Sequence, residues 1–279
     1  AAYDFTKRAL LAGKNVVTSN KELVAEYGYE LLKLAHDNNL NYLFEASVGG
    51  GIPIIRPITQ CLAANEIDEI SGILNGTTNY ILTKMLRDGE SFDAALRQAQ
   101  ANGYAEADPT ADIEGYDACR KICILADLAF GRHIYPSQVS THGITGITLA
   151  DMYYAKSGGM SIKLLGRAIR INRDKTCIFV EPHLVRDENL LSKVEDVFNG
   201  IMIKGNAVGD AMFYGSGAGK LPTASAVVAD IVAVVQNQGR DIMNFWSEEK
   251  LTLEDRSKTS KKFLVRIRGN EDAFKERIG

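Results

Sequence analysis

The first 46 residues follow a strand–helix–strand pattern, which constrains the fold more than any other part of the sequence. Residues 15–18 (NVVT) predict a short buried strand, residues 22–36 a helix, and residues 42–46 a second strand. A helix that connects two strands of one sheet makes them parallel, with a right-handed crossover. Ligands of such sheets bind beyond the carboxyl ends of the strands. The polar residues at that edge are Thr18, Ser19, Lys21, Glu45 and Ser47.

A further helix, over residues 3–12 and closed by Gly13, precedes this unit. In such a fold this helix normally follows a strand. We therefore expect the sequence to be a fragment of a longer protein.

The remaining sequence mixes strand and helix patterns around a different sheet, which predicts an α+β part. The expected strands cover residues 67–74, 161–171, 176–185, 211–214 and 262–268. Six helices are expected. Their positions are from residue 53 towards 64, residues 80–86, from a Ser91 cap to about 103, around residues 117–121, from the end of residues 215–223 to about 238, and from about 270 onwards. Residues 75–79 (NGTTN) are expected to form a turn and residues 247–262 a linker.

Composition places the chain among ordinary globular proteins and excludes several functional classes. With 46% hydrophobic and 24% charged residues, 279 residues suffice for two compact lobes. The net charge of −3 is spread evenly, which argues against nucleic acid or a membrane as partner. Four cysteines lie among apolar neighbours, so we expect reduced core residues in a cytoplasmic protein. They are Cys61, Cys119, Cys123 and Cys177.

Residues 103–126 contain charged side chains that give the clearest indication of a functional site. Asp117 and Lys121 are four residues apart, which places them on one face of a helix. Glu106 can fold back over that face from a Pro-containing loop. One amine among several carboxylates suits a small amino acid, with acids for its ammonium group and a lysine for proton transfer. The alternative is a solvated salt bridge beside a capping Asp112.

Two glycine-rich segments are ambiguous from their residues alone. Residues 215–223 (GSGAGKLPT) fail a Walker loop, because Tyr214 and Leu221 stand where glycine and Ser or Thr are needed, and the glycine interval does not fit a dinucleotide fingerprint. What remains is a turn that lets the backbone approach a ligand at a helix N-terminus. Residues 45–53 (EASVGGGIP) offer one carboxylate and several carbonyl oxygens, which suit either a cation or a flexible turn.

Five segments, taken in order, resemble those of homoserine dehydrogenases. They are TSNKELVA, FEASVGGGIPII, GILNGTTNYIL, GYAEADPTADIEGYDACRK and GSGAGKLPTASAVVADI. The resemblance covers nearly the whole chain, and five ordered motifs are highly specific. It implies an oxidoreductase that interconverts L-homoserine and L-aspartate 4-semialdehyde with NADP or NAD, in threonine and methionine biosynthesis. It further implies a homodimer or homotetramer.

The resemblance also assigns roles to individual residues. It makes Lys121 the proton donor and acceptor and Lys21 the lysine beside the nicotinamide. It makes Glu106 and Asp117 the acids that bind the substrate, with Asp112 in support. The implied cofactor-binding residues are Thr18, Ser19, Lys21, Gly103, Gly217 and Gly219. The implied sodium site consists of Glu45 with the carbonyl groups of Val48, Gly50 and Ile52.

The implied fold class is α/β, with a partial Rossmann-type lobe and an α+β substrate and dimerisation domain. Residues 1–47 would form the C-terminal half of the dinucleotide-binding domain, residues 48–208 the α+β domain, and residues 209–246 a return to the first domain. Residues 247–279 would be a linker and the start of an ACT-like βα unit. The alternative function is an amino-acid-binding regulatory module, or an inactive fragment, that keeps the acidic pocket without turnover.

Overall fold

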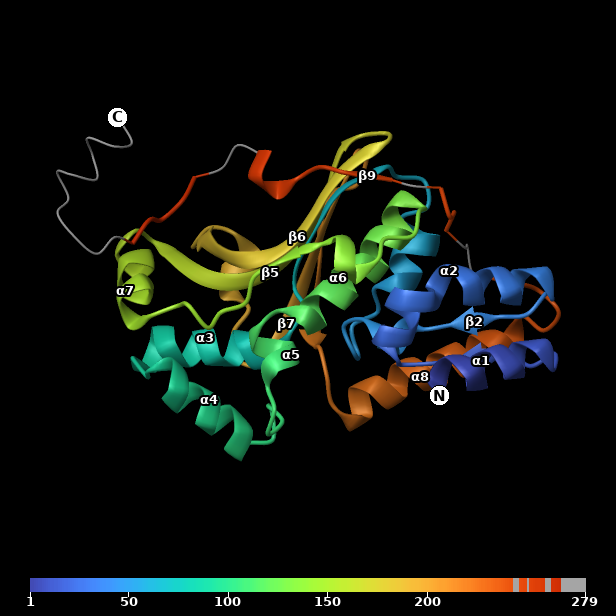
Figure 1. Cartoon of the computed structure of the whole chain (residues 1–279), viewed down its shortest axis with the longest axis horizontal. Helices are drawn as coiled ribbons and strands as arrows, with labels where there is room; N and C mark the ends of the chain where they lie inside the picture. Colours follow the sequence, from blue (N-terminus) through green and yellow to red (C-terminus); the bar gives the residue numbers. More distant parts are fainter. Residues whose placement is uncertain (243–245, 250, 259–261, 267–279) are drawn as a thin grey trace.

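The computed structural model describes residues 1–242, 246–249, 251–258 and 262–266. Two lobes lie side by side in it (Figure 1). The smaller lobe combines the first 47 residues with a helix from late in the chain, and the larger lobe surrounds a mixed sheet. The lobes meet where α2 packs against α6.

The small lobe contains the expected strand–helix–strand unit. Helix α1 (Ala2–Leu11) is followed by β1 (Val16–Val17), α2 (Lys21–Asp37) and β2 (Tyr42–Leu43), and the two strands pair in parallel. Asn20 caps α2, because its side-chain oxygen accepts a hydrogen bond from the Leu23 amide at 3.0 Å. These features confirm the predicted strand–helix–strand order and the parallel pairing, although the second strand ends early and residues 45–47 form a 3₁₀ turn.

Helix α8 (Lys220–Gln236) brings the chain back to the small lobe. It packs against β1 and against the 3₁₀ turn Glu45–Ser47. The buried Asp230 ties the helix in place, because its Oδ2 accepts a hydrogen bond from the Glu45 amide at 2.9 Å. The helix also exposes a row of apolar side chains: Leu221, Val228, Ile231, Val232 and Val235.

The large lobe is built on a sheet of seven described strands. Their order is β4 (Ser140–Thr141), β6 (Lys175–Arg186), β5 (Met160–Asn172), β3 (Ile67–Ile73), β7 (Phe198–Gly205) and β8 (Gly209–Ser216), with β9 (Thr252–Leu253) also paired to β6. The central pairs are antiparallel, whereas β4 and β9 run parallel to β6. Strand β3 therefore lies in the middle and ends beside the junction of the lobes.

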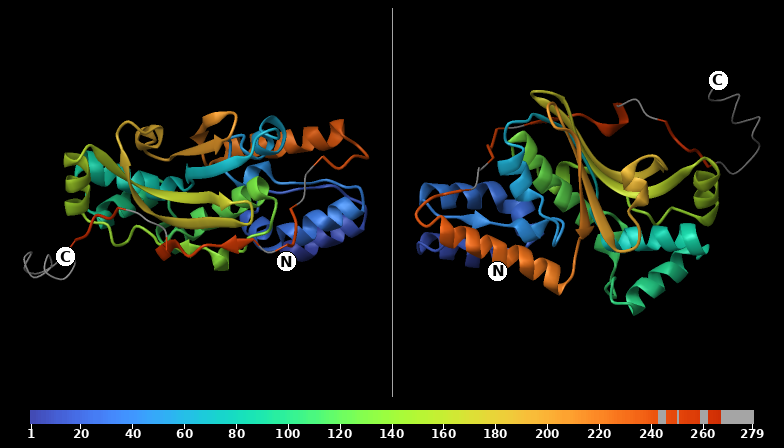
Figure 2. Two further views of the ribbon diagram at one scale, coloured as in Figure 1. Left: turned by 90° about the horizontal axis from the view of Figure 1, so that it is seen from above. Right: turned by 180° about the vertical axis from the view of Figure 1, so that it is seen from behind.

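Helices cover one face of this sheet. Helices α3 (Gly76–Asp88), α6 (Tyr116–Phe130) and α7 (Leu149–Ser157) pack on it, and α4 (Phe92–Ala101) lies on α3. Short helical segments complete the lobe: η2 (Pro57–Cys61), α5 (Thr110–Ile113), η3 (Pro136–Gln138), η4 (Leu190–Lys193) and η5 (Arg256–Lys258). The opposite face, seen from behind in Figure 2, is left largely open and is contacted by η4.

The structure corrects several expectations for the large lobe. The expected turn at 75–79 is the first turn of α3, with Asn75 as its N-cap. The helix expected from Pro53 begins at Ile55 and continues as a π-helical turn. Strand β8 pairs with β7, so the expected domain boundary at residue 208 falls inside a hairpin. The chain returns to the small lobe only with α8.

Strand β7 and helix α7 were not predicted. Cys61 is exposed, unlike the other three cysteines.

The segment after α8 is more than a linker. Trp246 is buried at 1% exposure and packs edge-on against Phe44 of the small lobe. Strand β9 then joins the large sheet. The edge strand expected at 262–268 is absent from the described part, residues 262–266, and its end and the expected helix near 270 lie outside the described residues. An ACT-like unit is therefore not confirmed. Within the described residues, no helix combines the length and apolar character needed to cross a membrane.

Candidate functional site

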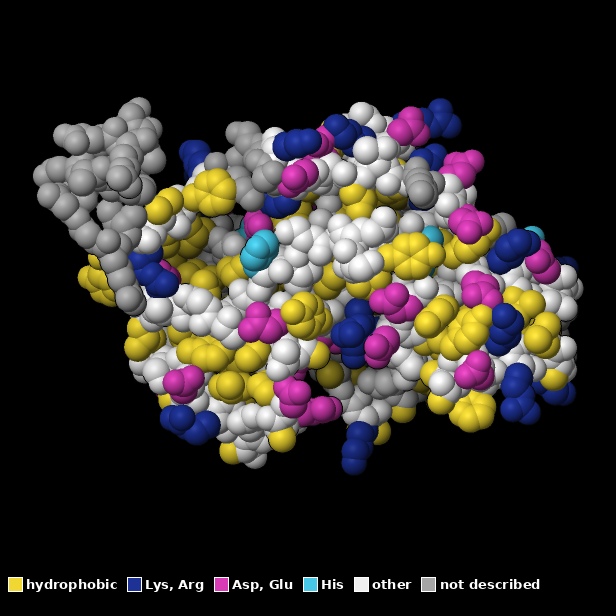
Figure 3. Space-filling view, in the orientation of Figure 1, with side chains coloured by type: hydrophobic (Ala, Val, Ile, Leu, Met, Phe, Trp, Pro, Cys, Tyr) yellow, Lys and Arg dark blue, Asp and Glu magenta, His cyan; other side chains and the backbone are white. Residues whose placement is uncertain are grey.

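A cavity of about 780 Å³ opens where the two lobes meet. Its walls are the loop after β1, the start of α3, the segment from Asn102 to Asp112, the first turns of α6, and the segment Ser216–Gly219. The space-filling view in Figure 3 shows acidic and basic side chains around a hollow at this junction. The cavity thus lies beyond the carboxyl end of β1, where the sequence predicted a ligand site.

Asp117 is the centre of the charged groups in the cavity. It lies in the first turn of α6, and its side chain is 8% exposed. Its Oδ2 lies 2.7 Å from the Lys121 amine, one turn along the helix, and its Oδ1 lies 3.0 Å from the Lys21 amine. One carboxylate therefore joins the two lysines that the sequence singled out, one from each lobe.

The two lysines differ in their surroundings. Lys121 is 11% exposed and also donates a hydrogen bond to the Leu74 carbonyl at the end of β3, at 2.7 Å. An ammonium group has three N–H donors. Leu74 and Asp117 take two of them, so among the described residues one remains for the cavity. Lys21 begins α2, and its side chain is 40% exposed.

Asp112 is held beside Asp117 by a residue that sequence reasoning missed. The Nδ2 group of Asn75 donates hydrogen bonds to Asp112 at 2.7 Å and to Asp117 at 2.8 Å. Asp112 lies in α5, and α6 is capped by Gly115, so the alternative of a capping aspartate is wrong. The N-G-T-T pattern could have indicated Asn75 as a helix cap, but no local pattern shows its reach to two aspartates.

The environment pushes the pKa values of the two aspartates in opposite directions. Burial raises the pKa of Asp117, but the charges of Lys121 and Lys21 outweigh burial and hold this pKa well below its usual range. Burial raises the pKa of Asp112, and the charge of Asp117 adds to this effect. Asp117 is thus the acid of the pair whose ionised form the site favours more.

Most of the remaining residues predicted for the site line the cavity, but Thr18 does not. Glu106 lines the cavity with an exposed side chain, together with Ser19, Gly103, Gly217 and Gly219. Gly219 has φ +117°, a backbone conformation that favours glycine, at the start of α8. Thr18 is not part of the lining, and its hydroxyl accepts a hydrogen bond from the Asn20 amide at 3.1 Å. Arg120, which the sequence analysis did not select, also lines the cavity.

The loop expected to bind sodium lies apart from this lining. The carboxylate of Glu45 accepts hydrogen bonds from three successive amides, those of Ile54, Ile55 and Arg56, at 2.7 to 2.9 Å. Gly50 has φ +56°, and a Cβ atom there would lie 2.6 Å from the Gly217 carbonyl oxygen. The loop therefore packs directly against the segment that precedes α8.

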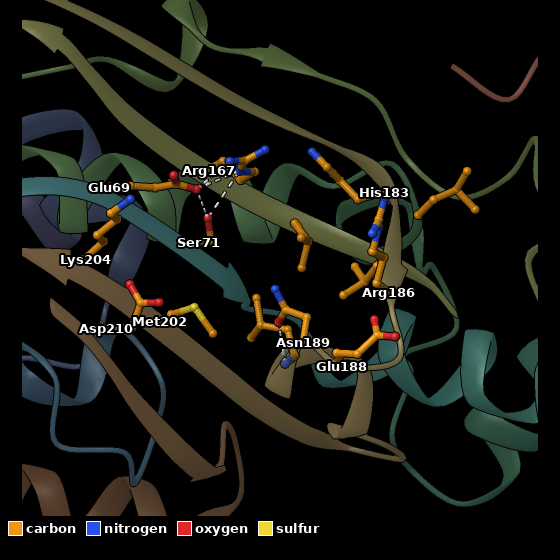
Figure 4. A pocket seen from close by; sticks show the side chains of 14 residues that line it. Glu69, Ser71, Arg167, His183, Arg186, Glu188, Asn189, Met202, Lys204 and Asp210 are labelled. Atoms are coloured by element: carbon orange, nitrogen blue, oxygen red, sulfur yellow. Dashed lines mark hydrogen bonds and ion pairs between the residues drawn. The ribbon is translucent and has the colours of Figure 1, made fainter. Parts of the chain in front are cut away.

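A second cavity, of about 740 Å³, lies on the open face of the sheet (Figure 4). Glu69, Ser71 and Arg167 form a hydrogen-bonded group there, with 3.0 Å between Arg167 Nε and Glu69 Oε1. Lys204 and Asp210 stand beside it. None of the residues proposed for catalysis or for binding lines this cavity.

Comparison with known proteins identifies the family of the chain. A sequence model described as homoserine dehydrogenase matches residues 53–232. The chain belongs to the homoserine dehydrogenase family. The homoserine dehydrogenase of Bacillus subtilis is 47% identical over 229 residues, which make up 82% of this chain and 53% of that protein. That of Helicobacter pylori is 41% identical over 267 residues, 96% of this chain and 63% of that protein.

Solved homoserine dehydrogenase structures share the fold. One from Thiobacillus denitrificans superposes with a TM-score of 0.83 at 44% identity, covering 85% of this chain and 56% of that chain. A hyperthermophilic archaeal homoserine dehydrogenase in complex with NADPH gives a TM-score of 0.73 at 32% identity, covering 84% of this chain and 68% of that chain. The chain spans about half the length of the curated relatives that it matches first.

Proposed function

We propose that the full-length protein is an enzyme that interconverts L-homoserine and L-aspartate 4-semialdehyde with NAD or NADP. The observation that carries the proposal is the bridging of two lysines, one from each lobe, by the buried Asp117 inside the cavity. A relative of the same family has been solved with NADPH, which supports the same class of cofactor here. The product would enter threonine and methionine biosynthesis.

The roles of the residues follow from the charge that the reaction moves. A nicotinamide cofactor, when bound, gives or takes the hydride. Reduction of the aldehyde leaves an alkoxide that needs a proton, and an ammonium group in a closed site can supply it. We assign this transfer to Lys121, which is more buried than Lys21 and keeps one N–H donor for the cavity.

We assign the substrate's ammonium group to Asp117, Asp112 and Glu106, which line the same cavity. Lys21 follows β1 and so lies on the side of the small lobe. There it would position the cofactor and the substrate, together with Ser19, Gly103, Gly217 and Gly219. Thr18 would support this edge indirectly, through its hydrogen bond to the Asn20 amide.

The direct test is the absorbance of reduced nicotinamide when the full-length protein is mixed with L-homoserine and either cofactor, with sodium and potassium present. Turnover is the expected result. Saturable binding of homoserine without any absorbance change would contradict the proposal and would favour an amino-acid-binding regulatory module.

We further propose a sodium ion at the loop after β2. The carbonyl groups of Val48, Gly50 and Ile52 belong to buried residues, and no donor among the described residues bonds to them. Buried carbonyl groups need partners, and hard cations take oxygen ligands. Glu45 would add negative charge beside them. Activity that is unchanged after replacement of all sodium and potassium by choline would contradict this proposal.

We also propose self-association through the open sheet face shown in Figure 4. A twofold interface must be complementary to itself. This face carries both acidic and basic side chains, and the partly buried Met202 lies on β7 opposite Ser71. The acids are Glu69, Glu188 and Asp210, and the bases are Arg167, Arg186 and Lys204. The full-length protein should be a homodimer or homotetramer by light scattering, and Met202→Glu should lower its mass towards that of a monomer. An unchanged mass would contradict this surface.

We also propose a division of the chain into a dinucleotide-binding domain and an α+β domain. Residues 1–47 with α8 form an α/β unit whose exposed apolar side chains on α8 suit coverage by further dinucleotide-domain structure. The α+β domain would then extend from residue 48 through β8. The four free cysteines suit a reducing compartment, so we propose the cytoplasm.

A further inference from the structure

Asn75 occupies the point where β3, α3 and the acids of the cavity meet. It is 5% exposed and directly precedes α3. Its Oδ1 accepts hydrogen bonds from the Thr78 amide at 2.8 Å and from the Thr78 hydroxyl at 3.0 Å. This half of the side chain is an N-cap for α3.

The other half of the side chain faces two carboxylates. The Nδ2 group donates to Asp112 Oδ1 at 2.7 Å and to Asp117 Oδ2 at 2.8 Å. The partners fix the orientation of the amide. A flipped amide would turn its oxygen towards both carboxylates and its N–H groups towards the Thr78 amide, and these three contacts would become repulsive; the Thr78 hydroxyl can accept as well as donate and does not decide the orientation.

The arrangement has an electrostatic consequence. Two carboxylates that share a site repel each other, and one of them then tends to take up a proton. Hydrogen bonds to a carboxylate favour its ionised form and are stronger than those between neutral groups. A single nitrogen within 2.8 Å of both oxygens shows that their spacing suits one nitrogen group that donates to both acids.

We propose that Asn75 is a positioning residue that holds Asp112 beside Asp117, so that both carboxylates receive the ammonium group of the substrate together. This inference rests on the proposed function, since it assumes that the cavity binds an amino acid. It goes beyond that function by assigning the geometry of the ammonium subsite to a neutral side chain on another element.

The test compares two substitutions in the full-length protein. Asn75→Ser keeps a helix-capping oxygen but is too short to bridge the two acids. Asn75→Asp keeps the size and the cap but places a third carboxylate against the other two. The control is Ser91→Ala, which removes the cap of α4, a hydrogen bond of 3.3 Å to the Ala94 amide outside the cavity.

The expected result is a selective loss of amino-acid binding. Loss of one charge-assisted hydrogen-bonding partner should raise the KM for homoserine by about 10- to 100-fold in Asn75→Ser, and further in Asn75→Asp. The KM for the cofactor should stay within about twofold, and Ser91→Ala should change neither value. An unchanged homoserine KM, or an equal rise in both KM values, would overturn the proposal, because Asn75 would then act only as a helix cap.

A titration without substrate separates this proposal from the proposed function. The groups that interact with Asp112 are Asn75, Thr77, Asp117 and Lys121. The other charged groups of the cavity are Lys21, Glu22, Glu106, Asp108 and Arg120. Removal of the Asn75 donor should raise the pKa of Asp112, measured by carbon-13 NMR of its carboxyl group with Asp112→Asn for assignment. A rise supports positioning even in a protein that does not turn over homoserine. No rise overturns it, whatever the activity.

Discussion

Asp117→Asn should destabilise the protein in a way that depends on pH. Asp117 and Lys121 are 8% and 11% exposed, so the substitution removes one partner of a buried ion pair. Breaking such a pair costs about 3–5 kcal/mol, since it leaves a buried charge without its partner. The contact with Lys21, which is 40% exposed, adds little because solvent screens it. We therefore expect the free energy of unfolding to fall by about 3–5 kcal/mol at pH 7.

The sign of the pH dependence follows from the pKa of Asp117. The lysines hold this pKa well below its usual range despite burial. An unfolded aspartate has a pKa of about 3.9. The carboxylate therefore stabilises the wild-type protein fully above about pH 5, and this stabilisation is lost as the pH falls through the lower, folded-state pKa. The difference between wild type and variant should shrink below about pH 4.

The assay is urea unfolding of the full-length protein at pH 7, 5 and 3.5. Asp37→Asn is a matched control, because Lys33 and Asp37 also lie one turn apart at 2.7 Å but are 50% and 52% exposed. This exposed pair should contribute almost nothing to stability. The reasoning is refuted if Asp117→Asn costs no more than the control, or if its cost is the same at pH 3.5 and pH 7.

Three further predictions concern single residues. Glu106→Gln should raise the KM for homoserine about 10-fold or more and the KM for the cofactor much less; equal effects would indicate a structural role for the loop. Gly28→Ala should destabilise the protein by about 1–3 kcal/mol in urea unfolding, because the new Cβ would lie 2.4 Å from the Trp246 ring; an unchanged unfolding midpoint would contradict the packing of Trp246. Burial raises the pKa of Asp127 to about 7, so stability should fall as the pH rises from about 4 to 7. Asp127→Asn should remove that slope, and a slope that persists in the variant would exclude Asp127 as its source.

Local patterns were sufficient to predict the elements that depend on them. The strand–helix–strand unit, strands β3, β5 and β6, and the Ser91 cap of α4 were all confirmed. The four-residue spacing of Asp117 and Lys121 predicted a contact that the structure contains at 2.7 Å. Each of these features depends on residues close together in the sequence.

The errors arose where tertiary contacts decide the structure. The residues from Gly76 to Asn79 have low helix propensity, yet they start α3, because Asn75 caps the helix and Thr77, Thr78 and Asn79 are buried. The reach of Asn75 to aspartates 37 and 42 residues away has no local signal. In α2, Gly28 faces the buried Trp246, which is 218 residues later and therefore has no local signal either.

The central claim is that Lys121 transfers the proton, whereas Lys21 positions the ligands. The most direct measurement is the kcat for homoserine oxidation by Lys121→Ala and Lys21→Ala in the full-length protein, with and without added ethylamine. Removal of a general acid or base costs about 10²- to 10⁴-fold. We predict that loss for Lys121→Ala, with cofactor affinity retained and partial rescue by the amine. Normal turnover by Lys121→Ala, together with an inactive Lys21→Ala that still binds both ligands, would contradict this claim. Proton transfer would then be assigned to Lys21 and ligand positioning to Lys121.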